Sequence, residues 1–442
     1  MKITHYSNAF HLVTAGDTKL VCDPWVGVQD NNAWITYPLH KDNPGILNDI
    51  GPDAIYISHL HCDHFDRKTL LEIDNKDIRF IIKDFPDHRL AGQIRELGFS
   101  NIDECEPWRE IEISPDMTVT VVPQDSNNIS EHESDIVYDL DTSLIVRDLN
   151  TNCVFYNNVD NPLTVKGFGD IRDYVSEKFD TDVDICCIPI GAGSEFPQCF
   201  LNIDRAEEGR KLIDDALENF KHRIEALKPK AWFFAGGSYI VYGKYNMLTH
   251  LIAQPSSDEQ KKYVQDNLDV QYLDANGGET LTHDGEKWVK SSESVVKRCG
   301  TVTEALAEFK DINYDYWDTA FTPDEIDRLY GSACENFFRI LDKRSVDMKW
   351  RYKFHLYDDL RLTEDGQISP DSQIAKTYEL TPPVEGEIVQ NLTLHMDDRL
   401  FGRLLTGQHN WNQSLSGTYI MFERTPNQFY PDVTGALNFL RA

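Results

Sequence analysis

Short apolar runs bounded by turn residues fill roughly the first 160 residues and predict a series of β-strands. The clearest runs cover residues 2–4, 19–22, 53–57, 78–82, 117–122, 143–146 and 153–156. A helix is predicted over residues 87–97. Pro24 and Gly27 would end the second strand and leave Asp23 at its carboxyl end.

Apolar side chains change to a helical spacing over residues 205–227. They recur every three or four positions, at Leu212, Ile213, Leu217, Phe220, Ile224 and Leu227. Lys228 and Pro229 end this helix, and the apolar run 231–235 predicts a strand that leads into Gly236 and Gly237. A strand, a helix and a second strand in succession are typical of an α/β layered sandwich.

The pattern changes again near residue 300. Helices are predicted over residues 303–309 and 323–341, an alternating strand over residues 349–356, and a break at Pro382 and Pro383. A chain of 442 residues is long enough for two domains. We therefore expect a first domain over residues 1–300 and a smaller α+β domain over residues 301–442.

The chain is strongly acidic, with 74 Asp and Glu residues against 43 Lys and Arg and a formal net charge of -31. Such a charge repels nucleic-acid phosphates and anionic lipids, so neither nucleic acid nor a membrane is an expected partner. The nine cysteines are odd in number and scattered, and no apolar run reaches the roughly twenty residues of a membrane span. These features, with no leader-like start, predict a reduced cytoplasmic protein that acts on a small molecule.

Candidate chemistry is concentrated directly after the predicted strand at residues 53–57. His59, His61, Asp63 and His64 follow it in the order H-x-H-x-D-H. Three imidazoles and a carboxylate released together from a strand end can surround one metal ion or two neighbouring ions. A histidine-rich surface loop is the alternative, but the spacing and the preceding strand favour a metal site.

A metal site needs ligands from other strand ends as well. Asp160, after the strand at residues 153–156, is the best distal candidate for a ligand, although a turn residue before Pro162 would look the same. Asp125 follows the strand at residues 117–122 and is a second candidate ligand. Gln124 beside it could be a ligand instead, and His132 is a further candidate. Otherwise Gln124 and His132 are expected, like Asp23, to support the ligands by hydrogen bonding.

At these residues the chain resembles the metallo-β-lactamase superfamily, in which H-x-H-x-D-H follows a strand and an aspartate such as Asp23 precedes it. The resemblance implies an αββα sandwich, here followed by the smaller α+β domain. Segments 158–160, 184–200, 220–239 and 417–426 are also similar to the metallo-β-lactamase portion of the CMP-N-acetylneuraminate hydroxylases. That narrower resemblance implies iron-dependent hydroxylation of a nucleotide sugar or a similar small polar metabolite.

The chain departs from these families in two ways. Cys62 and His64 form a C-x-H pair without the accompanying C-x-x-H, so no Rieske cluster is expected in this chain and an external electron donor would be needed. Hydrolytic members carry a late histidine after the strand equivalent to residues 231–235, where this chain continues with glycines. Gln124 or Asp125 stands where those members have an early third histidine.

Three functions remain open from the sequence. The first is an oxygenase with one or two irons, because oxygen-rich ligation suits iron; zinc and manganese are the alternative metals. The second is hydrolysis of an ester, lactone or phosphodiester by two cations, with Asp63 as the catalytic residue that orients a bound water. The third is a non-catalytic metal-binding protein on the same scaffold.

Substrate contacts are predicted near two glycine-containing strand ends. Gly193 and Ser194 follow an apolar run, and glycine-rich loops at such positions line pockets with backbone amides. Gly237, Tyr239 and Lys244 follow the strand at residues 231–235. Lys244 is expected to pair with a substrate phosphate in this acidic chain.

Overall fold

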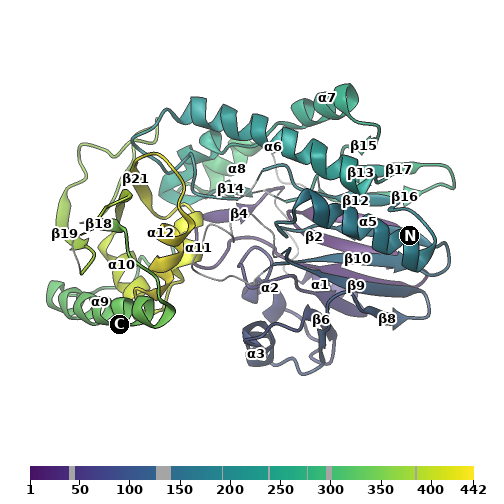
Figure 1. The fold of residues 1–442 in the computed structure, drawn as a ribbon, viewed down its shortest axis with the longest axis horizontal. Helices are drawn as coiled ribbons and strands as arrows, with labels where there is room; N and C mark the ends of the chain where they lie inside the picture. The colour runs from purple at the N-terminus through teal and green to yellow at the C-terminus, as the bar shows by residue number, and fades with distance from the viewer. Residues whose placement is uncertain are drawn as a thin grey trace.

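The computed structural model describes residues 1–38, 45–125, 141–191, 193–236, 239–275, 277–294, 301–383 and 386–442. Two large β-sheets lie face to face in the N-terminal part, and a smaller sheet lies at the opposite end of the molecule (Figure 1). Within the described ranges, no helix is both long and apolar enough to cross a membrane.

The first large sheet has eight strands. In spatial order they are β17 (Trp288–Ser294), β16 (Glu279–His283), β1 (Lys2–Ser7), β2 (Phe10–Ala15), β3 (Thr18–Cys22), β5 (Ala54–Tyr56), β6 (Arg79–Lys83) and β7 (Ile102–Cys105). The pairs from β17 to β3 are antiparallel and those from β3 to β7 are parallel. The carboxyl ends of β3 and β5 therefore meet at one edge of the sheet, where the H-x-H-x-D-H segment begins.

The second large sheet has seven strands. In spatial order they are β15 (Gln271–Leu273), β13 (Ala231–Phe233), β12 (Ile185–Cys187), β11 (Cys153–Asn157), β10 (Thr142–Asp148), β9 (Met117–Pro123) and β8 (Glu110–Ser114). Strands β11, β12, β13 and β15 run parallel, whereas β8, β9, β10 and β11 pair in antiparallel fashion. Thr142 at the start of β10 lies opposite Pro123 at the end of β9.

Helices cover the outer face of each large sheet. The first sheet carries α1 (Ile46–Ile50), α2 (Arg67–Leu71) and α3 (Arg89–Glu96), and the second carries α5 (Val165–Phe179), α6 (Arg205–Leu227) and α7 (Ser257–Asn267). One hydrophobic cluster joins the inner faces of both sheets and includes Leu20, Tyr56, Leu144 and Phe155. The four layers form an αββα sandwich, as predicted from the sequence.

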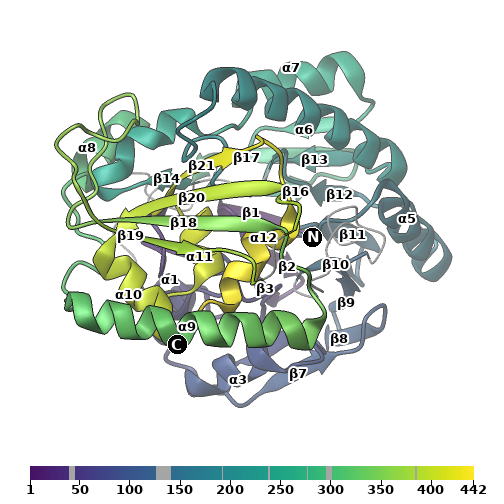
Figure 2. The ribbon, with the colours of Figure 1, turned by 60° about the vertical axis from the view of Figure 1, so that its left-hand side comes forward.

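The C-terminal part is built around a four-stranded sheet, whose strands lie side by side in Figure 2. Its spatial order is β19 (Ile374–Leu380), β18 (Trp350–Tyr357), β20 (Gln390–Asp397) and β21 (Met421–Thr425), and only β18 and β20 pair in parallel. Its helices are α8 (Val302–Phe309), α9 (Pro323–Arg344), α10 (Asp398–Thr406), α11 (Trp411–Ser416) and α12 (Pro431–Gly435), with the 3₁₀ turn η2 (Ala436–Phe439). Capping boxes at Thr301 and Thr322 explain where α8 and α9 begin.

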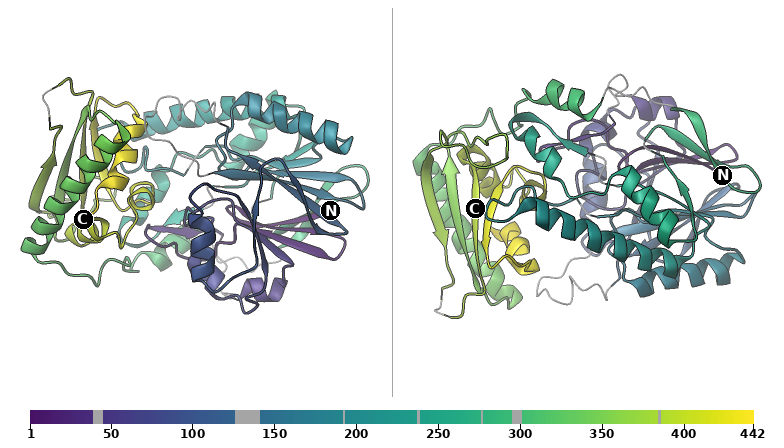
Figure 3. Two further views of the ribbon diagram at one scale, coloured as in Figure 1. Left: turned by 60° about the horizontal axis from the view of Figure 1, so that its bottom comes forward. Right: turned by 90° about the horizontal axis from the view of Figure 1, so that it is seen from above.

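The N-terminal part extends a small ribbon towards this C-terminal sheet. The ribbon pairs β4 (Trp34–Thr36) with β14 (Tyr239–Val241), followed by the 3₁₀ segment η1 (Gly243–Leu251). Its side chains share one hydrophobic cluster with the C-terminal sheet, from Ile35 and Tyr245 to Phe354 and Leu394. The yellow helices of the C-terminal part lie between its sheet and the rest of the molecule (Figure 3). This packing brings α11 next to the carboxyl ends of β3 and β5.

Candidate metal centre

The H-x-H-x-D-H segment is the loop between β5 and α2. Asp66 ends the loop and caps α2, because its carboxylate accepts the Thr69 backbone N–H at 3.1 Å. Ser58 anchors the beginning, where its carbonyl accepts a hydrogen bond from Thr142 Oγ1 at 2.8 Å. The loop is therefore tied at both ends, to its own helix and to the second sheet.

Asp23 supports this loop from behind. It follows β3, is 0% exposed, and accepts hydrogen bonds from the Ser58 N–H at 2.8 Å and the Ser58 hydroxyl at 2.6 Å. The same carboxylate lies 3.0 Å from Nδ1 of His64. Holding Nδ1 in this way turns Nε2 of His64 towards the inside of the site, where a metal ligand is needed.

His59, His61 and Asp141 form the first group of potential ligands. Nε2 of His59 lies 2.8 Å from Nδ1 of His61 and 3.5 Å from Oδ1 of Asp141. One ligand atom from each residue falls within 4.8 Å of the others. Two imidazoles and one carboxylate thus converge on a volume that suits one metal ion.

His64, Asp63 and Asp160 converge on the other side of His59. Nε2 of His64 lies 3.1 Å from Oδ2 of Asp160 and 3.4 Å from Oδ2 of Asp63. His59, His64 and Asp160 also place one ligand atom each within 4.8 Å of one another. The loop that carries Asp160 is held by Asn161, whose side-chain amide donates to Ser143 Oγ at 3.0 Å.

The electrostatics of the cluster favour a bound cation. Burial, with help from His64, lowers the pKa of His59, and burial likewise lowers the pKa of His61. For His64, burial is outweighed by Asp63 and Asp160, which raise its pKa well above the usual value. The pKa values of Asp63 and Asp160 are lowered by His64 in spite of burial. Neutral imidazoles beside ionised carboxylates are the ligand forms that bind metal, and a metal would replace the proton on His64.

The residues therefore fit a divalent metal site. Three imidazoles and three carboxylates converge from the loop after β5, the start of β10 and the end of β11; they belong to His59, His61, His64, Asp63, Asp141 and Asp160. Three carboxylates gathered in one cluster would repel one another without a compensating cation. Imidazole and carboxylate donors of this kind bind several divalent metals, iron, manganese and zinc among them.

Comparison with known families agrees with this geometry. Residues 2–214 match the family model described as "Beta-lactamase superfamily domain". The αββα sandwich of the N-terminal part is consistent with the metallo-β-lactamase fold.

About a quarter of this chain also matches the sequences of named proteins. A protein of Mycobacterium tuberculosis provisionally named a Rieske 2Fe-2S iron-sulfur protein is 35% identical over 106 residues, which is 24% of this chain and 20% of that protein. Its counterpart in Mycolicibacterium smegmatis is 34% identical over 108 residues, with the same shares of each chain. The chain thus matches about a fifth of the length of these relatives.

Solved structures with a similar fold include Igni18, a metallo hydrolase from Ignicoccus hospitalis. Its TM-score is 0.44 and its sequence identity is 15%, and the match covers 64% of this chain and 99% of that chain. CmlA, a diiron β-hydroxylase from Streptomyces venezuelae, has a TM-score of 0.41 and 16% identity over 62% of this chain and 53% of that chain.

The structure groups the distal candidate carboxylates differently from the grouping expected from the sequence. Asp125 belongs to neither ligand group, and its carboxylate instead accepts a hydrogen bond from Thr164, the residue that caps α5. Asp141, just before β10, takes the place expected for Asp125, because the start of β10 lies at the same sheet edge as the end of β9. Gln124 accepts the Asp141 backbone N–H at 3.5 Å. His132 lies outside the described residues.

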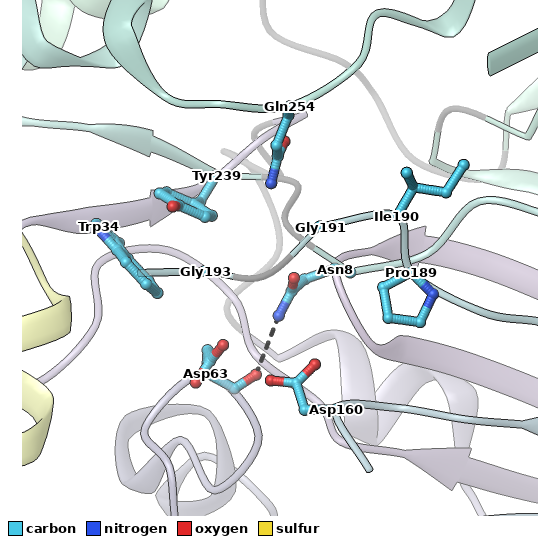
Figure 4. A pocket seen from close by; sticks show the side chains of 11 residues that line it. Asn8, Trp34, Asp63, Asp160, Pro189, Ile190, Gly191, Gly193, Tyr239 and Gln254 are labelled. Atoms are coloured by element: carbon cyan, nitrogen blue, oxygen red, sulfur yellow. Dashed lines mark hydrogen bonds between the residues drawn. The ribbon is translucent and has the colours of Figure 1, made fainter. Parts of the chain in front are cut away.

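A cavity opens beside the two carboxylates of Asp63 and Asp160 (Figure 4). Trp34 and Tyr239 form one wall, with their rings stacked at a centroid distance of 3.9 Å and an interplanar angle of 21°. Gly193 lies against the Trp34 ring, and both Gly193 and Tyr239 line the cavity, where a contact with substrate stays a prediction. Ser194 lines a neighbouring groove instead, and Gly237 lies outside the described residues.

Lys244 is located differently from the expectation. Its ammonium group lies 3.1 Å from Oδ1 of Asp359 and 2.6 Å from Oδ2 of the fully buried Asp397. Both carboxylates belong to the C-terminal part, so the charge of Lys244 is already compensated and links the two parts of the chain. A phosphate would have to displace two aspartates to bind it.

The C-terminal part contributes one residue to the site that the sequence did not indicate. The side-chain amide of Asn412, in α11, lies 2.8 Å from Nε2 of His61. The loop before β4 and the start of β4 hold α11 in place. The Asn410 backbone N–H donates to Asn31 at 2.8 Å, and the Trp34 indole N–H donates to Thr418 at 3.0 Å. Asn412 lies 351 residues from His61, so no local pattern could have paired them.

Proposed function

We propose that this chain is an iron-dependent oxygenase that acts on a nucleotide sugar or a similar small polar metabolite. The observation that carries the proposal is the carboxylate at Asp141, which joins His59 and His61 in a set of two histidines and one carboxylate. Such a set, with positions left open, is typical of non-haem iron oxygenases. A third imidazole at this position would have favoured zinc.

The proposal assigns a role to each ligand group. His59, His61 and Asp141 would hold one ion, and His64 with Asp63 and Asp160 would hold a second. Iron supplies the one-electron oxygen chemistry that no protein side chain can perform. The Rieske name of the mycobacterial relatives gives further support, because an external electron donor of that kind would provide the reducing equivalents this chemistry needs.

The surrounding residues would position the substrate and protect the reaction from water. The stacked rings of Trp34 and Tyr239 present an apolar wall, against which a planar or sugar ring can pack. Asn8, which also lines the cavity, donates its amide to the Asp63 carbonyl at 3.4 Å and fixes that part of the loop. Asp63 and Asp160 face the same space, and a carboxylate oxygen there can accept a hydrogen bond from a substrate hydroxyl.

The experiment that tests the proposal starts from metal-free protein loaded with iron without oxygen. Oxygen consumption is then followed in the presence of a chemical reductant and candidate nucleotide sugars. We expect uptake by the iron form, its loss in Asp141→Ala, and normal uptake in His222→Ala, which changes an exposed histidine of α6. Turnover by a zinc form without oxygen would contradict the proposal.

Hydrolysis of an ester, lactone or phosphodiester is the second candidate function. The observation that favours it is the position of Asp63, whose carboxylate both lines the cavity and lies 3.4 Å from Nε2 of His64. A carboxylate placed there could orient a water between two cations. Cleavage of a generic phosphodiester by the zinc form, abolished in His61→Ala, would favour this function over the oxygenase.

A further inference from the structure

A groove beside the metal cavity contains an arginine that the site described above does not use. One stripe of α6, including Asn219 and Arg223, forms one side of this groove, and Gly191, Ser194 and Gln198 contribute to the other. Gly191 also lines the cavity next to Asp63 and Asp160 (Figure 4). The two spaces therefore adjoin at this residue.

Arg223 has no carboxylate partner among the residues that the structure describes. Its recorded neighbours are the Phe168 ring, 5.9 Å from the guanidinium carbon, and the Tyr156 hydroxyl group. One helical turn before and after it stand Asn219 and Leu227, neither of which is charged. Burial lowers the pKa of Arg223, because the protein around it desolvates the guanidinium without neutralising it.

A second arginine on the same helix shows the contrast. Arg210 forms ion pairs with Asp214 at 2.7 Å and with Glu259 at 2.8 Å. In a chain with a net charge of -31, a partly buried arginine without a carboxylate is an unusual arrangement. A guanidinium group that is partly buried without a carboxylate partner costs desolvation free energy, and an anionic ligand would offset that cost.

Gln198 provides independent evidence that this groove receives a ligand. Its side chain is 1% exposed, and its Nε2 donates to the Ser194 carbonyl, which fixes the orientation of the amide. Its Oε1 is buried and has no hydrogen-bond partner among the described residues. A buried acceptor left without a donor is costly, so a hydroxyl group on a ligand would stabilise it.

We propose that Arg223 and Gln198 form a subsite for an anionic group of the substrate, a carboxylate or a phosphate that carries or adjoins a hydroxyl. The proposal rests on the proposed function in one respect, namely that the reacting part of the same molecule occupies the cavity beside Asp63 and Asp160. Arg223 would bind the anion through paired N–H groups, and Gln198 would accept the neighbouring O–H. The described residues that line the metal cavity include no Lys or Arg, so the anionic group belongs in the groove.

Calorimetric titration with inorganic phosphate, and separately with acetate, tests the subsite and distinguishes the two anions. We expect one or both to bind the wild-type protein and to bind Arg223→Gln at least tenfold more weakly. Arg210→Gln is the matched control, because it removes the same charge from the same helix and should leave the affinity unchanged. Asn219→Asp places a carboxylate one turn from Arg223, where it should cause a similar loss of anion affinity. Because residue 219 is exposed, this change should not alter the stability of the fold.

The same titration in His61→Ala separates the groove from the metal centre, since anion bound to a metal would be lost there and anion on Arg223 would remain. Equal binding by the wild type, Arg223→Gln and Asn219→Asp, or no binding of either anion to the wild type, would overturn the subsite. If the iron form consumes no oxygen but Arg223 still governs phosphate binding, the oxygenase is contradicted and the subsite is supported.

Discussion

Replacement of Asp23 by asparagine should weaken metal binding although Asp23 is not a ligand. Oδ2 of Asp23 accepts the Ser58 hydroxyl at 2.6 Å and lies 3.0 Å from Nδ1 of His64, and the side chain is 0% exposed. In Asp23→Asn an amide N–H group takes the place of Oδ2 and faces the N–H of His64. Two donors then meet, and neither has an acceptor. One buried donor without an acceptor costs about 1–3 kcal/mol in the free energy of unfolding. Loss of the group that orients His64 should lower metal affinity about 10–100-fold.

Competition with a coloured chelator measures the metal affinity of Asp23→Asn, and urea unfolding of the metal-free protein measures its stability. Asp184→Asn is the matched control, because Asp184 is also buried and accepts the Val154 N–H at 2.8 Å but lies at the start of β12. The control should lose stability and keep its metal affinity. If Asp23→Asn retained the wild-type affinity, the support of His64 by Asp23 would not matter for metal binding, and this reasoning would be refuted.

Three further changes test other parts of the structure. Lys244→Met should lower the free energy of unfolding by about 2 kcal/mol, because it removes a cation from the buried Asp397; an unchanged urea midpoint would contradict this. Asn412→Ala should reduce metal affinity about tenfold in the chelator assay by freeing the His61 ring, and equal affinity would show that the contact is dispensable. Burial lowers the pKa of His395 to about 3, whereas the pKa of histidine in the unfolded chain is about 6.5. Below pH 6.5 the unfolded chain therefore binds a proton that the folded protein does not, and the free energy of unfolding falls as the pH decreases. From pH 6.5 to 5 the wild type should lose about 1.6 kcal/mol more than His395→Gln in urea unfolding, and parallel pH profiles would contradict the assignment.

The sequence predicted those parts of the fold that depend on local patterns. The helix expected over residues 205–227 is α6, and the strands expected at residues 117–122, 143–146 and 153–156 are β9, β10 and β11. The helix α5 (Val165–Phe179) was not predicted, although Thr164 caps it and its buried residues recur at helical spacing. The short strands β4 and β14 could not be predicted, because each has three residues and exists through pairing with the other.

The candidate site was predictable only where its residues are close in sequence. His59, His61, Asp63 and His64 share one loop, and Asp160 follows a recognisable strand. Asp141 required the register of β9 and β10, which places the start of one strand beside the end of the other. The same sheet edge therefore carries residues just before β10 as well as residues just after β9. The metal-binding role of all these residues stays a prediction until a metal is measured.

The metal content of the protein, purified without added metal and measured by mass spectrometry, tests the central claim most directly. The account predicts that iron is the dominant metal at one or two ions per chain, and that Asp141→His shifts the content towards zinc by adding a nitrogen ligand. Zinc as the dominant metal in the wild type, with iron near the background level, would contradict the account.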